Sequence, residues 1–148
     1  MLSNPKNHIV FEPDNNVIKA LEYNRKISNS NFIIIEGIIS NKNNCNCKIN
    51  YNGYGTNITF DNNDNNDNIK CFKLSDINCY NFNTLVIDCE GCFYNFLHEN
   101  YKFLNNIHTI ILENDNTSQY IANQNLFILQ KLGFKCIYKF FIWSTWKK

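Results

Sequence analysis

Carboxylates follow three short apolar runs of the chain, at the point where each run ends. The acids are Glu12, Asp88, Glu90 and Glu113, and the runs cover residues 9–11, 85–87 and 110–112. A carboxylate can orient or deprotonate a hydroxyl group. One placed just past the second strand of a dinucleotide-type fold can accept hydrogen bonds from ribose hydroxyls. The simpler interpretation is that each acid ends a strand at the solvent, but a set aligned along one sheet edge favours a functional site.

A second group that could do chemistry is the pair Cys89-x-x-Cys92. It lies where a strand is expected to meet a helix, a placement that activates thiols in thioredoxin-like redox proteins. That fold also has a cis-proline downstream of its cysteines, whereas Pro5 and Pro13 lie upstream here. We therefore expect both cysteines to be reduced and buried in apolar positions. Thiol redox chemistry is the alternative.

The sequence predicts no metal site. Cys45-x-Cys47 has a poor spacing for structural zinc, and no second close pair with zinc spacing follows. The Asn/Asp run at residues 61–68 could pass for a calcium loop. However, Asn66 stands where an EF-hand needs Gly, and Phe72 stands where it needs a bidentate Glu. We interpret this run as a solvated loop.

The elements that must position these acids alternate between strand and helix. β-branched and aromatic runs predict strands over residues 9–11, 32–36, 84–88, 108–113 and 134–141. Apolar residues at helical spacing predict helices over residues 15–28, 93–104 and 118–132. Asp14 suits the start of the first helix, and Gly133 suits the C-cap of the last. The strand runs are mostly continuous, as in a parallel sheet covered by helices.

This alternation predicts one α/β domain over residues 1–148, with a mainly parallel sheet. Residues 40–77 are short, polar runs that predict an antiparallel insertion, with small strands at 58–60 and 70–73. In parallel strands, carboxyl ends share one sheet edge. We therefore expect four acids to line that edge: Glu12, Glu36, Asp88 and Glu113.

Composition excludes several function classes. The 14 Lys and Arg against 13 Asp and Glu give a net charge of +1, without the basic excess of nucleic-acid-binding proteins. No apolar run approaches the roughly 18 residues of a membrane-spanning helix, and the start of the chain has no run of signal-peptide length. The odd count of 7 Cys favours reduced thiols and a cytoplasmic location. About a fifth of the residues are Asn, a bias typical of an AT-rich genome.

Several segments resemble motifs of FkbM-family methyltransferases in their order and spacing. Phe11-Glu12-Pro13-Asp14 and Ile35-Glu36-Gly37-Ile38 resemble the second and third motifs of that family. Leu85-Val86-Ile87-Asp88-Cys89-Glu90-Gly91 resembles its Lys-Ile-Asp-Val-Glu-Gly signature. The resemblance runs from about residue 9 to residue 113.

The resemblance implies a Rossmann-like class I methyltransferase sheet and S-adenosyl-L-methionine as the methyl donor. The implied reaction is O-methylation of a hydroxyl on a sugar or small metabolite. By the resemblance, Glu12 would bind the cofactor ribose, and Glu36 and Ile38 would flank the adenine. Asp88 and Glu90 would then face the methyl group and the acceptor hydroxyl, as catalytic residues.

The chain departs from the family pattern in two places. Family members have a strand and a Gly-rich turn ahead of the Glu-Pro motif, whereas only 11 residues, none of them Gly, precede Glu12. We therefore expect the first strand and its loop to be missing, cofactor binding to be weak or lost, and an oligomer or partner to cover the exposed sheet edges. Cys92-Phe93 also stands where the family has a small residue and Glu. The alternative function is a non-catalytic methyltransferase-like remnant or interaction protein.

Overall fold

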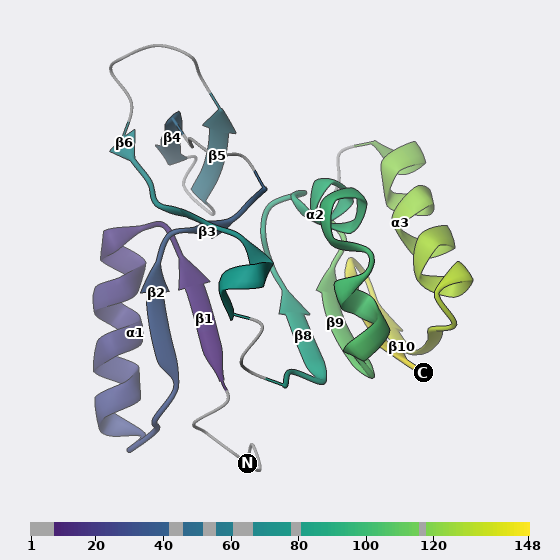
Figure 1. Ribbon diagram of the computed structural model, residues 1–148, viewed down its shortest axis with the longest axis horizontal. Coiled ribbons are helices and arrows are strands. Elements are labelled where there is room, and N and C mark those ends of the chain that lie inside the picture. Colours follow the sequence, from purple (N-terminus) through teal and green to yellow (C-terminus); the bar gives the residue numbers. More distant parts are fainter. Residues whose placement is uncertain (1–7, 42–45, 52–55, 61–66, 78–80, 116–117) are drawn as a thin grey trace. The chain divides into compact units, whose positions relative to one another are not determined.

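The computed structural model describes residues 8–41, 46–51, 56–60, 67–77, 81–115 and 118–148, the strands within residues 46–68 by their backbone alone (Figure 1). The chain divides into two compact units, Met1–Tyr80 and Asn81–Lys148, which we call unit 1 and unit 2. That these form the single domain expected over residues 1–148 stays a prediction.

Unit 1 begins with a β-α-β element. β1 (Ile9–Glu12) and β2 (Ile33–Glu36) pair in parallel, with Ile9 opposite Ile33, and α1 (Asn15–Ile27) connects them (Figure 1). The helix starts where it does because Asp14 accepts the backbone N–H of Asn16 at 2.8 Å and satisfies a donor that the first turn leaves unpaired. The strands and helix predicted for this segment are confirmed.

The rest of unit 1 consists of short strands and one turn of 3-10 helix, η2 (Leu74–Ile77). The antiparallel part has strand order β5-β4-β6 and consists of β4 (Asn46–Tyr51), β5 (Thr56–Phe60) and β6 (Asp67–Asn68). Antiparallel pairing is thus present within the insertion predicted over residues 40–77. β7 (Cys71–Phe72) instead pairs in parallel with β3 (Ile38–Ile39), which follows β2 directly.

Unit 2 is a four-stranded mixed sheet with strand order β10-β11-β9-β8. Its strands are β8 (Thr84–Ile87), β9 (Thr109–Glu113), β10 (Lys135–Phe140) and β11 (Trp143–Lys147). β8 and β9 are parallel, and β11 runs antiparallel to both of its neighbours. Its helices are α2 (Phe93–Asn100) and α3 (Gln119–Lys131), with a 3-10 turn, η3 (Phe103–Asn106), before β9.

Among the described residues, no helix combines the length and apolar character needed to cross a bilayer.

Two sequence predictions for unit 2 are wrong in detail. A single last strand was expected over residues 134–141, but the chain turns at Phe141, whose φ is +52°, and returns as β11. β11 was missed because no Gly, Pro or Asn marks this turn. The helix expected over residues 93–104 ends at Asn100 and is followed by η3. The helix predicted over residues 118–132 is confirmed, with Gly133 following it at a φ of +87°.

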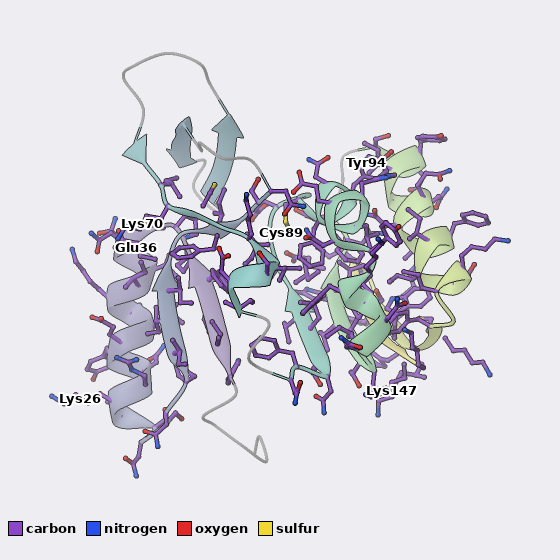
Figure 2. The ribbon with its side chains drawn as sticks, in the orientation of Figure 1. Lys26, Glu36, Lys70, Cys89, Tyr94 and Lys147 are labelled. Carbon is purple, nitrogen blue, oxygen red and sulfur yellow. A yellow bond between two sulfur atoms is a disulfide. The ribbon has the colours of Figure 1, made fainter. Side chains whose placement is uncertain are left out.

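The apolar core of unit 2 lies between the sheet and the two helices (Figures 1 and 2). Its buried members come from every element except β10: Ile87, Phe93, Leu97, Leu104, Ile107, Ile110, Leu112, Leu129, Phe134 and Trp146. The buried positions of β9 and β11 alternate, as a strand with one covered face requires. This core holds β8 and β9 in place, and both strands end at the acids considered next.

Candidate functional site

Unit 1 places two predicted acids side by side. Glu12 and Glu36 are the last residues of β1 and β2 and lie opposite each other in the parallel register. Glu12 accepts the backbone N–H of Asp14 at 2.8 Å, which holds its carboxylate over the start of α1. Glu36 is exposed, at the end of unit 1 away from Lys26 (Figure 2). Both acids are therefore at a carboxyl end of parallel strands, as predicted.

The backbone turns sharply after this pair. The N–H of Gly37 donates to the Glu12 carbonyl at 3.0 Å, and the N–H of Ile38 donates to the Lys70 carbonyl at 3.0 Å. Gly37 has a φ of +147°, and a Cβ atom there would lie 2.7 Å from a ring carbon of Phe72. As a result, the half-buried Ile38 lies in β3 and pairs with β7.

Unit 2 brings a second pair of predicted acids together. Asp88 follows β8 and Glu113 ends β9, and these strands are parallel neighbours with Ile87 opposite Leu112. A hydrogen bond that protonated Glu113 donates to Asp88, with desolvation and the negative charges around it, raises the pKa of Glu113 from 4.5 to about 7. A hydrogen bond between two carboxyl groups needs one proton, so this pair keeps a proton up to a higher pH than isolated acids do.

Two further acids adjoin that pair. Glu90 is exposed, and its pKa is raised by some desolvation, by the charge and hydrogen bonding of Asp115 and by the charge of Asp88. Glu90 also has a φ of +50°, uncommon for a residue with a side chain. Asp115 was missed in the sequence because it follows no apolar run of its own. The available signal was its position two residues after Glu113.

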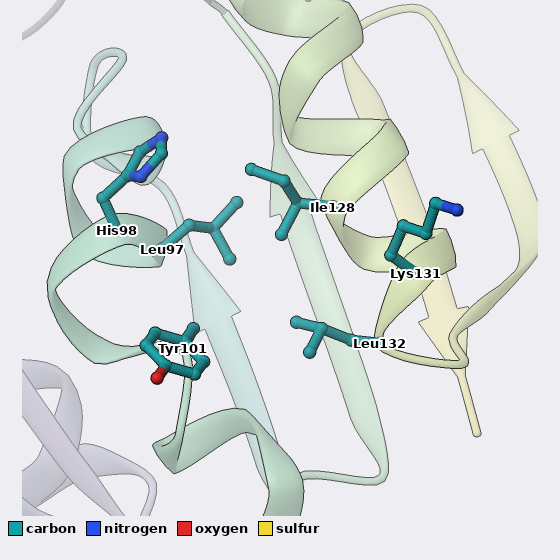
Figure 3. Close-up of a pocket in the computed structure, with 6 residues that line it drawn as sticks. All are labelled: Leu97, His98, Tyr101, Ile128, Lys131 and Leu132. Carbon is teal, nitrogen blue, oxygen red and sulfur yellow. The ribbon is translucent and has the colours of Figure 1, made fainter.

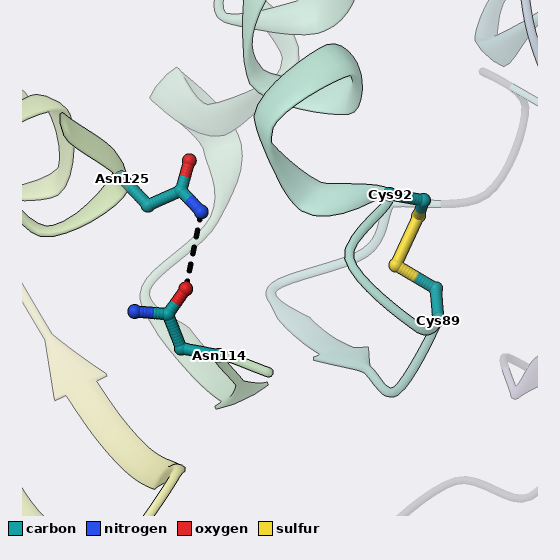
Figure 4. The surroundings of a disulfide bond; sticks show 4 residues. All are labelled: Cys89, Cys92, Asn114 and Asn125. Atoms are coloured by element: carbon teal, nitrogen blue, oxygen red, sulfur yellow. Dashed lines mark hydrogen bonds between the residues drawn. A yellow bond between two sulfur atoms is a disulfide. The ribbon is translucent and has the colours of Figure 1, made fainter. Parts of the chain in front are cut away.

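Asn114 anchors the segment that carries Glu113 and Asp115. Its backbone N–H donates to the Ile142 carbonyl at 2.8 Å. Its side-chain oxygen accepts from the amide of Asn125 on α3 at 3.1 Å (Figure 4), and its own amide donates to the Ala122 carbonyl at 3.3 Å. Asn125 is fully buried. These contacts fix the end of β9 against α3 and so position the acids beside it.

The expectation for the cysteines is wrong. Cys89 and Cys92 are joined in a disulfide, and Cys92 is exposed rather than buried (Figure 4). Cys71 is also disulfide-bonded, whereas Cys136 is a free, exposed thiol. The spacing of three residues and the turn between strand and helix bring the two sulfur atoms together, and this local geometry decides that the thiols are bonded.

The structure thus assembles Glu12 with Glu36, and Asp88 with Glu90 and Glu113. That Glu12, Glu36, Asp88 and Glu113 share one edge stays a prediction, since each pair belongs to a different unit. In the part of the chain that the structure describes, no three His, Cys, Asp or Glu side chains are arranged to hold a metal ion. What the acids of unit 2 do offer is hydrogen bonding and proton exchange.

A shallow pocket of about 330 Å³ lies between α2 and α3 of unit 2 (Figure 3). Its lining combines apolar side chains with a histidine and a lysine: Leu97, His98, Tyr101, Ile128, Lys131 and Leu132. None of the acids described above lines it. It is therefore separate from the carboxylates.

Comparison with known proteins finds no match to a protein-family model, to a curated protein or to a solved structure. The chemistry of the site follows from its own geometry. In unit 1 that geometry offers adjacent carboxylates that can accept hydrogen bonds from hydroxyls. In unit 2 it offers a carboxyl pair that can hold or release a proton near neutral pH.

Proposed function

We propose that this protein is an S-adenosylmethionine-dependent methyltransferase-like protein of the FkbM type, acting on a hydroxyl of a sugar or small metabolite. The observation that carries the proposal is the in-register pair Glu12 and Glu36, at the carboxyl ends of two parallel strands joined by α1. In α/β sheets, ligands bind at that end, and an acid after such a strand accepts hydrogen bonds from ribose hydroxyls.

The roles proposed for individual residues follow the resemblance to that family. Glu12 would bind ribose, and Glu36 and Ile38 would flank the adenine. Asp88 would accept a hydrogen bond from the hydroxyl that is to be methylated and would take its proton. Glu90 would orient the same hydroxyl. The raised pKa of Glu113 supports this assignment, because Glu113 then carries the shared proton and the carboxyl group of Asp88 can accept a hydrogen bond. S-adenosylmethionine, when bound, would supply the methyl group.

The residues present fit this cofactor only in part. Glu12 is half-buried and anchored through Asp14, which suits a ribose-binding carboxylate. Gly37, which follows Glu36, leaves no room for the methionine end of the cofactor, because Phe72 and the Lys70 carbonyl already occupy the space next to it. Each missing hydrogen bond costs about 0.5 to 1.5 kcal/mol, so several together weaken binding by orders of magnitude. We therefore propose weak cofactor binding.

A second candidate function is a non-catalytic interaction protein of the same fold. The observation that favours it is β10, one of the two edge strands of the unit 2 sheet, in which all six residues are exposed. Ile137, Tyr138 and Phe140 are each more than half exposed, at 56%, 59% and 57%. An edge strand with exposed apolar side chains can pair with another chain. An oligomer or a partner protein would cover it.

Titration with S-adenosylmethionine up to millimolar concentration, followed by ¹H–¹⁵N spectra of the labelled protein, tests the main proposal. We expect shifts around Glu12, Glu36 and Ile38, with a dissociation constant of about 0.1 to several millimolar. Glu12→Gln should abolish these shifts, since an amide carries no charge and has only one oxygen acceptor. That variant can still accept the N–H of Asp14, so the start of α1 is retained.

Glu22→Gln is the matched control, because Glu22 is exposed on α1, remote from the end of β1. It should bind the cofactor as the unmodified chain does. An absence of localised shifts at millimolar cofactor would reject the methyltransferase-like proposal and favour the interaction protein. Micromolar binding that is lost in Glu12→Gln would instead show that other residues supply the missing cradle.

A further inference from the structure

Two cysteines close a short loop between β8 and α2. The disulfide joins Cys89, two residues beyond β8, to Cys92, the N-cap of α2, and their Cα atoms lie 5.4 Å apart. The two intervening residues, Glu90 and Gly91, have φ angles of +50° and +86°. The backbone turns tightly enough here for the two sulfur atoms to meet (Figure 4).

The two sulfur-bearing side chains differ in their access to solvent. Cys92 is exposed, whereas Cys89 is half-buried and packs against the apolar core of unit 2. Thiol–disulfide exchange begins when a thiolate attacks one sulfur of the disulfide, and the choice of sulfur depends on access. An incoming thiol therefore reaches Cys92, and Cys89 becomes the leaving group.

The start of α2 favours negative charge on Cys92. The first N–H groups of a helix lack partners within the helix, and the helix dipole stabilises an anion at that end. Cys92 occupies the N-cap of this eight-residue helix. Once the disulfide opens, this end of the helix favours a thiolate on Cys92 while the neighbouring acids oppose it, so exposure is what makes Cys92 the reactive thiol of the pair.

We propose that Cys89–Cys92 is a redox-active disulfide that exchanges with thiols through Cys92. A thiolate attacks the Cys92 sulfur and forms a mixed disulfide, the Cys89–Cys92 bond breaks, and its electron pair leaves on Cys89, which takes up a proton. A second thiolate then attacks the outer sulfur of the mixed disulfide and releases Cys92. Two external thiols become one disulfide, and the protein disulfide becomes two thiols. This activity is independent of the proposed methyltransferase function.

The surrounding charge selects the kind of thiol. Asp88 and Glu90 flank Cys89 in the chain, and Glu113 and Asp115 interact with those two acids. An anionic thiol such as glutathione is repelled by this group, whereas a cationic one such as cysteamine is attracted. The substrates are therefore neutral or cationic thiols, including cysteines in basic segments of other proteins. Added salt should reduce the preference.

The first experiment traps the mixed disulfide in the full-length chain. In Cys89→Ser, Cys92 has no partner, so reaction with cystamine, the disulfide of cysteamine, should leave a stable adduct on Cys92 that peptide mass spectrometry can locate. Oxidised glutathione, the anionic counterpart, should react more slowly. In the complementary Cys92→Ser variant, the half-buried Cys89 should react at least tenfold more slowly than Cys92 does in Cys89→Ser.

Cys136 provides an internal control in the same molecules. It is exposed and free, but it lies next to Lys135 on β10 rather than among acids. The ratio of cystamine rate to glutathione-disulfide rate should be about tenfold higher at Cys92 than at Cys136 at low salt, and the two ratios should converge at 1 M salt. This comparison removes the intrinsic difference in reactivity between the two reagents.

The unmodified chain supplies a test that needs no substitution. Millimolar dithiothreitol should open Cys89–Cys92 while the circular dichroism spectrum stays folded, and cystamine should close it again. Alkylation followed by peptide mass spectrometry distinguishes this pair from Cys71. A pair that stays closed in the folded chain would overturn the proposal in favour of a purely structural disulfide. Equal charge preference at Cys92 and Cys136 would overturn the assigned substrate class.

Discussion

Asp88 and Glu113 hydrogen-bond through their carboxyl groups at the ends of two neighbouring parallel strands. The two residues are 25 positions apart in the chain, and they meet because Ile87 and Leu112 lie opposite each other in β8 and β9. The proton in this hydrogen bond is the largest cause that raises the pKa of Glu113 from 4.5 to about 7, with desolvation and the nearby acids as further causes. Proton binding at this pair is therefore linked to folding.

The first prediction concerns the stability of the protein between pH 5 and pH 8. The folded chain binds the Glu113 proton more tightly than the unfolded chain, because the pKa is raised from 4.5 to about 7. This contribution to stability is fully present below about pH 4.5 and is lost as pH rises through 7. The Tm of the unmodified chain should therefore fall over this pH range. In Glu113→Gln this fall should be smaller by about 2 to 5 °C, because the amide donates to Asp88 without needing the proton.

Thermal melts at pH 5, 6, 7 and 8 would measure this effect, with Glu22→Gln on exposed α1 as the control. That control should follow the unmodified chain at every pH. A Glu113→Gln variant with the same pH profile as the unmodified chain would mean that the pair does not share a proton.

The second prediction contrasts two glycines with positive φ angles. At Gly37 a Cβ atom would meet Phe72 at 2.7 Å, whereas at Gly133 nothing lies within 4 Å of such an atom. Gly37→Ala should therefore lower the free energy of unfolding by about 3 to 5 kcal/mol, through strain and overpacking together. Gly133→Ala should lower it by about 1 to 2 kcal/mol, through backbone strain alone. Urea titrations would measure both, and equal losses would contradict the close packing at Gly37.

The third prediction concerns the hydrogen bond between Asn125 and Asn114. Asn125→Ala removes the donor to Asn114 and should lower the free energy of unfolding by about 1 to 3 kcal/mol, since a part-buried acceptor is left unpaired. Asn123→Ala is the control on the same helix, because Asn123 is exposed. It should change stability by less than about 0.5 kcal/mol. Equal effects of the two substitutions would show that Asn125 does not anchor the end of β9.

The fourth prediction concerns the core of unit 2. Leu129 of α3 is completely buried, so Leu129→Ala should lower the free energy of unfolding by about 2 to 5 kcal/mol. Tyr120, on the same helix, is 70% exposed, and Tyr120→Ala should have an effect within about 0.5 kcal/mol. Chemical denaturation of the two variants would measure the difference. Comparable losses would mean that α3 does not pack on the sheet through Leu129.

Local signals predicted much of the secondary structure. The cap at Asp14 and the positive φ at Gly133 depend on residues within one helical turn, so these two helix ends could be predicted from the adjacent residues of the sequence. Apolar runs located β1, β2, β8 and β9 for the same reason. By contrast, β11 carries both apolar and polar residues, and its place between β9 and β10 arises from pairing with strands that precede it.

By itself, the sequence determined that acids follow strands, because a carboxylate after a short apolar run is a local pattern. The tertiary structure decided that β1 and β2, and β8 and β9, pair in parallel, whereas the rest of the unit 2 sheet is antiparallel. Only the tertiary structure decided which acids interact: Asp88 with Glu113, and Glu90 with Asp115. It also decided that Cys89 and Cys92 meet in a disulfide with one sulfur-bearing side chain exposed. The physical reason is that protonation depends on distances between groups and on burial, and these follow from strand register and packing, not from spacing along the chain.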